Sequence, residues 1–214
     1  MAGVKLHVLP SGPLQTIGYL LTSSEHREAV LIDAPEGILR KVEPILSAEK
    51  CRLSELWITH GHWDHTQHAA LVARTTGAKI RAHVDDQRMI ETPEIMRRYL
   101  GDDIQLEPAH VDAWVTHGER FQILGFDVEV RHVPGHCPGS VLYYFPQAQA
   151  AFVGDVLFNH SVGRTDLPGG KFEVLEHSIR SQVYTLPEST AVYPGHGPST
   201  TVLDEKLENP YVRA

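Results

Sequence analysis

The stretch of sequence that decides the fold is Thr59-His60-Gly61-His62-Trp63-Asp64-His65. It places three imidazoles and one carboxylate, all side chains that bind divalent cations, directly after the apolar run Leu56-Trp57-Ile58. A strand that ends here directs alternate side chains to one place, and a helix beginning near Asp64 adds more from its first turn. The sequence therefore predicts a metal site where a strand, a loop and a helix meet.

The residues before this stretch predict a small sheet. Three short strands are expected at Val4–Leu9, Thr16–Thr22 and Ala29–Asp33, joined by turns as an antiparallel meander. Apolar residues then recur at helical spacing over Ile38–Leu46, and Leu53–Thr59 is the strand that carries the metal-binding stretch. This alternation of strand and helix predicts a sheet with helices packed on its outside.

The residues after the stretch continue the alternation. An Ala-rich helix is expected from Asp64 to Arg74, ending before Gly77, and Lys79–Ala82 is the next strand. The charged segment His83–Pro108 contains short helical patterns, including Glu94–Leu100, and no cluster of metal ligands. We expect it to be an insertion over the site.

The second half of the chain is predicted to be rich in strands. Strands are expected at Phe121–Leu124, Asp127–Val133, Val141–Phe145, Ala150–Val153 and Ala191–Tyr193, and helices at Phe172–Tyr184 and Leu203–Glu208. No segment between these elements has the composition of a linker, and 214 residues are enough for one large core. We therefore expect a single domain over residues 1–214.

Three later residues of metal-binding type follow predicted strands, each directly after a glycine. They are His136, Asp155 and His196. The complete candidate set is His60, His62, Asp64, His65, His136, Asp155 and His196. A catalytic ion with an open position needs about three protein ligands, so this set is large enough for two ions.

The composition argues against several classes of partner. The formal net charge is −8 and no basic cluster is present, so we expect neither nucleic acid nor an anionic membrane as a partner. The N-terminus has no long apolar core, and no later segment is apolar enough to span a bilayer, which predicts a soluble cytoplasmic protein. Cys51 and Cys137 are expected as reduced thiols. The sequence leaves the oligomeric state open.

The order of these ligands, His-x-His-x-Asp-His and then His, Asp and His, resembles the metallo-β-lactamase superfamily over about residues 6–198. Within that superfamily the chain is similar to the small single-domain hydrolases related to glyoxalase II, the hydroxyacylglutathione hydrolases. The motifs that carry this resemblance are Pro134–Ser140, Gly154–Phe158, Gly163–Asp166, Gly195–Thr201 and Asn209–Tyr211.

The resemblance implies an α/β fold, the four-layer αββα sandwich, with the site at one edge. It implies that one ion is held by His60, His62, His136 and a bridging Asp155, and the other by Asp64, His65, His196 and the same Asp155. Zinc is the ion we expect first, although iron and manganese accept the same ligands.

Two departures from the resemblance matter. Cys137 stands where the related proteins usually have threonine, which places a thiol beside His136. The chain also ends soon after Gly197 and Pro198, whereas classical glyoxalase II continues into a helical domain that supplies basic residues for glutathione. We expect no such C-terminal helical domain here, so the reaction type carries over better than the substrate.

A site of this kind suits hydrolysis. Two cations that share a water lower its pKa toward neutrality, so that metal-bound hydroxide attacks a carbonyl, and we expect Asp64 to orient it. A thiolate, with a pKa of about 8.5 in its thiol, departs without a proton donor. The expected activity is therefore hydrolysis of a small-molecule thioester such as S-lactoylglutathione.

Several alternatives stay open at this stage. A persulfide dioxygenase acting on glutathione persulfide also carries Gly-Arg-Thr-Asp and uses one iron held by two histidines and a carboxylate, but the intact second set with His196 favours the hydrolase. A lactonase or β-lactamase would keep the same site, and a metal-binding module without activity is disfavoured by the full ligand set. Arg164 and Asp166 are expected either to steady the loop after Asp155 or to form a surface salt bridge.

Overall fold

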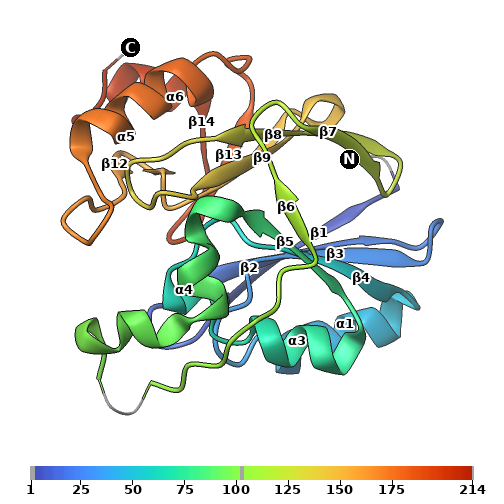
Figure 1. Cartoon of the computed structure of the whole chain (residues 1–214). Coiled ribbons are helices and arrows are strands. Elements are labelled where there is room, and N and C mark those ends of the chain that lie inside the picture. The colour runs from blue at the N-terminus through green and yellow to red at the C-terminus, as the bar shows by residue number, and fades with distance from the viewer. Residues whose placement is uncertain (1–2, 102–103, 214) are drawn as a thin grey trace. The chain divides into compact units, whose positions relative to one another are not determined.

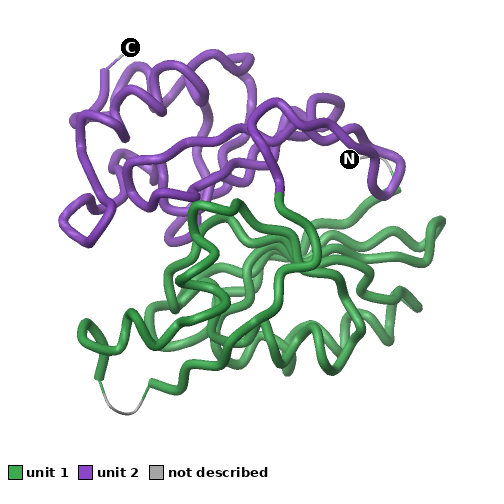
Figure 2. Tube along the Cα trace, viewed as in Figure 1, with its two compact units in different colours: residues 1–114 green, residues 115–214 purple. Residues whose placement is uncertain are grey.

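The computed structural model describes residues 3–101 and 104–213. Contacts along the chain divide it into two compact units, residues 1–114 and residues 115–214 (Figure 2). Each unit has its own sheet and its own helices. The assignment of all 214 residues to one domain stays a prediction. Among the described residues, no helix is both long and apolar enough to cross a bilayer.

The sheet of unit 1 is six-stranded, in the order β1-β2-β3-β4-β5-β6 (Figure 1). Its strands are β1 (Lys5–Ser11), β2 (Thr16–Ser23), β3 (Glu28–Ile32), β4 (Arg52–Trp57), β5 (Lys79–His83) and β6 (Ala113–Val115), and the unit boundary falls within β6. The pairs β1–β2 and β2–β3 are antiparallel, which confirms the predicted meander, while β3–β4 and β4–β5 are parallel. The short strand β6 was not expected.

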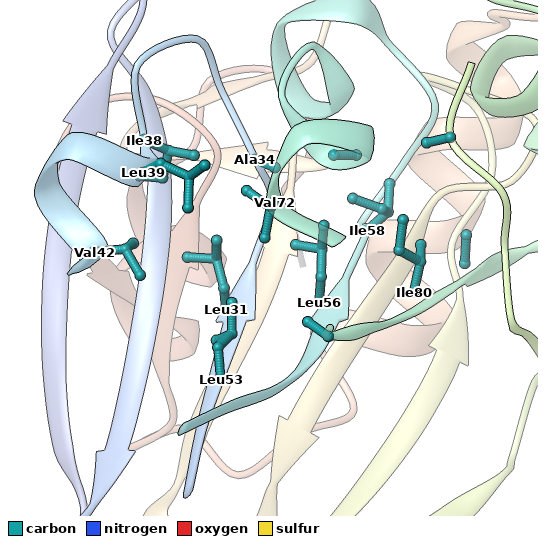
Figure 3. Close-up of a cluster of buried hydrophobic side chains, with 14 of the residues drawn as sticks. Leu31, Ala34, Ile38, Leu39, Val42, Leu53, Leu56, Ile58, Val72 and Ile80 are labelled. Atoms are coloured by element: carbon teal, nitrogen blue, oxygen red, sulfur yellow. The ribbon is translucent and has the colours of Figure 1, made fainter. Parts of the chain in front are cut away.

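Six helical segments complete unit 1. Among the described residues they are α1 (Leu39–Glu49), α2 (Trp63–Thr66), α3 (Ala69–Thr76), the 3₁₀ turn η1 (Val84–Asp86), α4 (Gln87–Glu91) and the 3₁₀ helix η2 (Pro93–Tyr99). Helices α1 and α3 cover one face of the sheet, where Val42 and Val72 pack with Leu31, Leu53 and Leu56 (Figures 1 and 3). All five side chains are almost fully buried, so removal of this apolar surface from water stabilises the unit.

The helix predicted over Asp64–Arg74 is wrong in one respect, because it is broken between α2 and α3. The backbone of Ala34 causes the break. Its N–H donates to the carbonyl of His65 at 2.8 Å, and its carbonyl accepts from the N–H of His68 at 2.9 Å. These two groups would otherwise bond along a continuous helix. Helix α3 ends at Gly77, which has a φ of +74°, as predicted.

The sheet of unit 2 is also six-stranded, in the order β14-β13-β10-β9-β8-β7. Its strands are β7 (Arg120–Ile123), β8 (Phe126–His132), β9 (Val141–Phe145), β10 (Ala150–Gly154), β13 (Ala191–Pro194) and β14 (Thr200–Thr201). Strands β10 and β13 are parallel, and the described pairs among the other strands are antiparallel. The predicted hairpin formed by β7 and β8 is confirmed.

The remaining elements of unit 2 are one small hairpin and several helical segments. The hairpin pairs β11 (Leu157–Phe158) with β12 (Ser161–Val162), and the helical segments are the 3₁₀ turn η3 (Pro146–Ala148), α5 (Phe172–Ser178), its π-helical continuation η4 (Ile179–Val183) and α6 (Val202–Glu208). Leu175 of α5 and Val202 of α6 belong to one buried apolar cluster with Leu142 and Val153 of the sheet. The β11–β12 hairpin was not predicted, since strands of two residues have no readable period.

Candidate metal centre

Unit 1 gathers the four candidate ligands of the first stretch. His60 lies in the loop after β4, and Asp64 and His65 lie on α2 with His62 at its N-cap. The ring centroid of His60 is 4.8 Å from that of His62 and 4.1 Å from that of His65. His65 Nε2 lies 3.4 Å from Asp64 Oδ2. The strand, loop and helix thus bring these four side chains together, as predicted.

Asp33, directly after β3, fixes the tautomers of two of these histidines, that of His65 directly and that of His60 through Thr59. Its Oδ2 lies 2.8 Å from His65 Nδ1, and it accepts from the hydroxyl of Thr59 at 2.8 Å. Because a carboxylate only accepts, His65 carries its proton on Nδ1 and presents the lone pair of Nε2. The Thr59 oxygen in turn lies 3.1 Å from His60 Nδ1, so the same argument leaves Nε2 of His60 as an acceptor.

Sequence reasoning did not find Asp33 as part of the site. Its carboxylate is buried at 1 % exposure and also accepts from the backbone N–H of Thr59 at 2.8 Å. Its φ of +61° is in the left-handed region, which a non-glycine residue occupies only when the surroundings hold it there. The available signal was an acidic residue at the end of a buried strand, one strand away from the metal-binding stretch.

Two further contacts shape the loop that carries His60 and His62. The hydroxyl of Thr16 donates to Asp64 Oδ2 at 2.7 Å, which orients that carboxylate. The N–H of Gly61 donates to Asp86 Oδ2 at 2.7 Å, and a Cβ at position 61 would lie 2.8 Å from the Cβ of Met89. The segment beginning at η1 therefore packs directly on the loop, which fits the predicted insertion. The predicted helical pattern at Glu94–Leu100 corresponds to the 3₁₀ helix η2, Pro93–Tyr99.

Unit 2 gathers the three later candidates. His136 follows β8, Asp155 follows β10 directly and His196 follows β13. Asp155 Oδ2 lies 3.7 Å from His136 Nε2 and 3.5 Å from His196 Nε2. Ligand atoms about 2.1 Å from a tetrahedral ion lie about 3.4 Å apart, so these separations match two ligands of one ion. The N–O donor set is that of zinc, iron or manganese sites.

The tautomer of His136 is fixed by the backbone. Its Nδ1 lies 2.7 Å from the carbonyl of Arg164, so Nδ1 donates and Nε2 keeps its lone pair toward Asp155. Gly135 before it has a φ of +126°, and a Cβ there would lie 2.2 Å from the backbone nitrogen of Leu175. Only glycine fits this turn.

The side chains of Arg164 and Asp166 form a surface pair. Two hydrogen bonds of 2.7 Å join them, and both side chains are more than half exposed. The hydrogen bond from Arg164 lowers the pKa of Asp166 to about 2. The contact of Arg164 with His136 comes from its backbone carbonyl, so the guanidinium is not required for it. Within the described residues neither Cys51 nor Cys137 is part of a disulfide, and Cys137 is buried.

The candidate ligands thus form two groups, four residues in unit 1 and three in unit 2. Within each group the atoms that would contact a metal are nitrogen lone pairs and carboxylate oxygens at short separations. The chemistry of both groups fits a divalent ion. The assignment of all seven residues to two shared ions stays a prediction.

Comparison with known proteins decides the family. A family model described as the metallo-beta-lactamase superfamily matches residues 12–196. The chain belongs to the metallo-β-lactamase superfamily. It is 31% identical to hydroxyacylglutathione hydrolase GloC of Haemophilus influenzae, over 99% of each chain. The chain is thus a metal-dependent hydrolase of this superfamily, as its similarity to proteins of that kind indicates.

Solved structures of the same superfamily agree. The crystal structure of the BLEG-1 B3 metallo-beta-lactamase has a TM-score of 0.88 and 36% identity, and covers 98% of this chain and 100% of its own. TTHA1623 in a di-iron-bound form has a TM-score of 0.84 and 32% identity, and covers 96% and 100%. The predicted metallo-β-lactamase fold is confirmed. The histidine and aspartate groups are typical of the dinuclear metal sites of this superfamily.

Proposed function

We propose that this metallo-β-lactamase superfamily member hydrolyses thioesters of the hydroxyacylglutathione type, with S-lactoylglutathione as the representative substrate. The observation that carries the proposal is the complete, ordered ligand set, in which neighbouring groups fix the tautomers of His60, His65 and His136. Full-length similarity to a hydroxyacylglutathione hydrolase supports the choice of substrate.

The proposed ligands of two divalent ions are His60, His62, Asp64, His65, His136, Asp155 and His196. Such ions, when bound, lower the pKa of a shared water and polarise a carbonyl. Zinc is the ion proposed first, and iron and manganese suit the same donors. Asp33 and the carbonyl of Arg164 hold two of these imidazoles with Nε2 ready to bind a cation.

Side chains of this protein orient the attacking water and accept one of its protons in the proposed reaction. The Thr16 hydroxyl holds the carboxylate of Asp64, which we assign to orient the attacking water and accept its proton. A thiolate leaves without protonation at neutral pH, so this set of residues needs no additional acid for a thioester. The proposed partner is therefore a small molecule. The net charge of −8 disfavours nucleic acid and anionic membrane surfaces.

A second candidate is hydrolysis of a β-lactam, favoured by the 36% identity to the BLEG-1 B3 metallo-beta-lactamase. The amide nitrogen that leaves in that reaction is a poorer leaving group than a thiolate and needs a proton. This difference places the thioester first. A persulfide dioxygenase with one iron is the alternative from another reaction class.

The test is the initial rate of S-lactoylglutathione hydrolysis by metal-replete protein without oxygen. His136→Ala removes a proposed ligand, and His110→Ala is the matched control because the side chain of His110 is 85% exposed. We expect turnover that falls at least about 100-fold in His136→Ala and is unchanged in His110→Ala.

Turnover by the unaltered protein that is no faster than that of His136→Ala would refute the thioester proposal. Cleavage of nitrocefin would then identify a β-lactamase. Oxygen uptake with glutathione persulfide, together with one iron per chain, would identify a dioxygenase.

A further inference from the structure

The hairpin β11–β12 and the residue after it, Gly163, lie beside every proposed ligand of unit 2. The hairpin begins two residues after Asp155. Gly163, the residue directly after β12, lies at the open end of the hairpin, and a Cβ there would lie 1.8 Å from the carbonyl oxygen of Asp155 and 3.0 Å from His136 Nδ1. The ring of Phe158, in β11, meets that of His196 edge-on with centroids 6.1 Å apart. The hairpin therefore lies against the three residues of unit 2 that we assign to metal.

The turn of the hairpin is held by residues near the C-terminus. The backbone N–H of His160 donates to both carboxylate oxygens of Glu205, at 3.0 and 3.2 Å. Asn209 donates from Nδ2 to the carbonyl of Ser161 at 3.2 Å and to Glu205 Oε2 at 2.7 Å. His160 has a φ of +56°, a left-handed conformation that costs free energy and that such contacts offset.

Glu205 is a buried carboxylate with an exposed fraction of 0 %. Its described hydrogen-bond donors are the N–H of His160, the amide of Asn209 and the hydroxyl of Thr200 at 2.7 Å, which are all uncharged. Burying a carboxylate among uncharged donors is costly, and an apolar side chain would pack helix α6 on the sheet at lower cost. This cost indicates a role of the carboxylate beyond packing. Its two oxygens accept the N–H of His160 and so hold the turn of the hairpin.

The Asn209-Pro210-Tyr211 motif completes this connection. Asn209 Oδ1 accepts from the N–H groups of Tyr211 and Val212 at 2.9 and 3.1 Å. The backbone of the tail therefore turns around the Asn209 side chain. The side chain is then held with Nδ2 toward the hairpin and Glu205. One asparagine thus joins the tail, helix α6 and the hairpin.

We propose that Glu205 and Asn209 are positioning residues for metal binding, which act by fixing the β11–β12 hairpin and, through it, Asp155, His136 and His196. The proposal rests on the proposed function only in taking these three residues as metal ligands. It predicts that a change at the C-terminus, in side chains that touch no metal, weakens metal binding.

The test is zinc binding by the full chain, measured by competition with a chromophoric chelator, together with the visible spectrum of the cobalt-substituted protein. Glu205→Gln keeps the shape of the side chain but replaces one carboxylate oxygen by an NH₂ group, which cannot accept from the donors that surround it. We expect about 10-fold weaker zinc binding, the usual scale for residues that orient ligands, and altered cobalt d–d bands. Asn209→Ala, which leaves the Glu205 carboxylate in place, is expected to weaken binding in the same direction.

Tyr184→Phe is the matched control. The Tyr184 hydroxyl shares its one proton between the carbonyl oxygens of Glu205 and Val212, at 3.0 and 2.7 Å. Its loss therefore loosens the same helix and tail without removing a contact to the hairpin. Zinc affinity and the cobalt spectrum are expected to stay as in the unaltered protein, even where the urea midpoint falls.

Unaltered zinc affinity and cobalt spectrum in both Glu205→Gln and Asn209→Ala would overturn the positioning proposal. Equal losses in Tyr184→Phe would also overturn it, because they would reduce the effect to general stability. A chain that binds zinc as expected but does not hydrolyse S-lactoylglutathione would contradict the proposed function alone. A chain that binds no zinc or cobalt would overturn both.

Discussion

Replacement of Asp33 by asparagine tests how the site controls its histidines. Asp33 Oδ1 accepts from the Thr59 N–H, and Oδ2 accepts from the Thr59 hydroxyl and from His65 Nδ1, each at 2.8 Å. Asparagine keeps the shape and tolerates the left-handed backbone, but it replaces Oδ2 by an NH₂ group. The Thr59 hydroxyl can rotate to accept from that group. His65 must move its proton from Nδ1 to Nε2.

The size of the effect follows from these contacts. The contacts of a buried carboxylate become those of a neutral amide, and loss of this charge assistance lowers the free energy of unfolding of the metal-free protein by about 1.5–3 kcal/mol. The shifted proton removes the lone pair of His65 Nε2, and losses of this kind weaken metal binding about 10- to 100-fold. That factor corresponds to about 1.4–2.7 kcal/mol.

The assay measures zinc affinity by chelator competition and stability by urea unfolding of the metal-free protein. Asp112→Asn is the control, because Asp112 Oδ2 also accepts a backbone N–H, that of Ile80 at 2.9 Å, and its described partners are Lys79 and Ile80. We expect the control to bind zinc normally. Normal zinc affinity in Asp33→Asn would refute the argument that Asp33 selects the tautomer of His65.

Two further predictions concern unit 2. Gly135→Ala places a Cβ 2.2 Å from the backbone nitrogen of Leu175 and should lower the free energy of unfolding by more than about 3 kcal/mol. Gly77 also has a positive φ, +74°, but has open space around it, so Gly77→Ala should lower that free energy by only about 1–2 kcal/mol. Urea unfolding compares the two, and equal losses would contradict the steric argument. Burial raises the pKa of Tyr184 to about 12 from an ordinary value near 10. The unfolded chain therefore ionises first, and stability should fall as pH rises from about 10 to about 12. An alkaline series of urea midpoints should show this fall in the unaltered protein and a smaller one in Tyr184→Phe.

Much of the fold could be predicted because it is written in local patterns. The meander β1–β3, the strand β4 and the hairpin β7–β8 follow from alternating or continuous apolar runs bounded by turn residues. The helix after Asp64 was predicted as one piece, because its residues favour helix and nothing within it breaks the pattern. It is two helices because Ala34, distant in the sequence, takes the hydrogen bonds at the break.

The candidate site could likewise be predicted only in part. The sequence alone determined the seven candidate ligands, because side chains that bind metals are few, and their spacing after predicted strands limits what they can do. Only the tertiary structure decided which groups hold them. Asp33 reaches His65, the Arg164 carbonyl reaches His136, and Glu205 reaches the turn of the β11–β12 hairpin. Each of these hydrogen bonds joins residues far apart in the chain. A hydrogen bond needs two atoms about 3 Å apart, and separation along the sequence carries no information about that distance until the chain has folded.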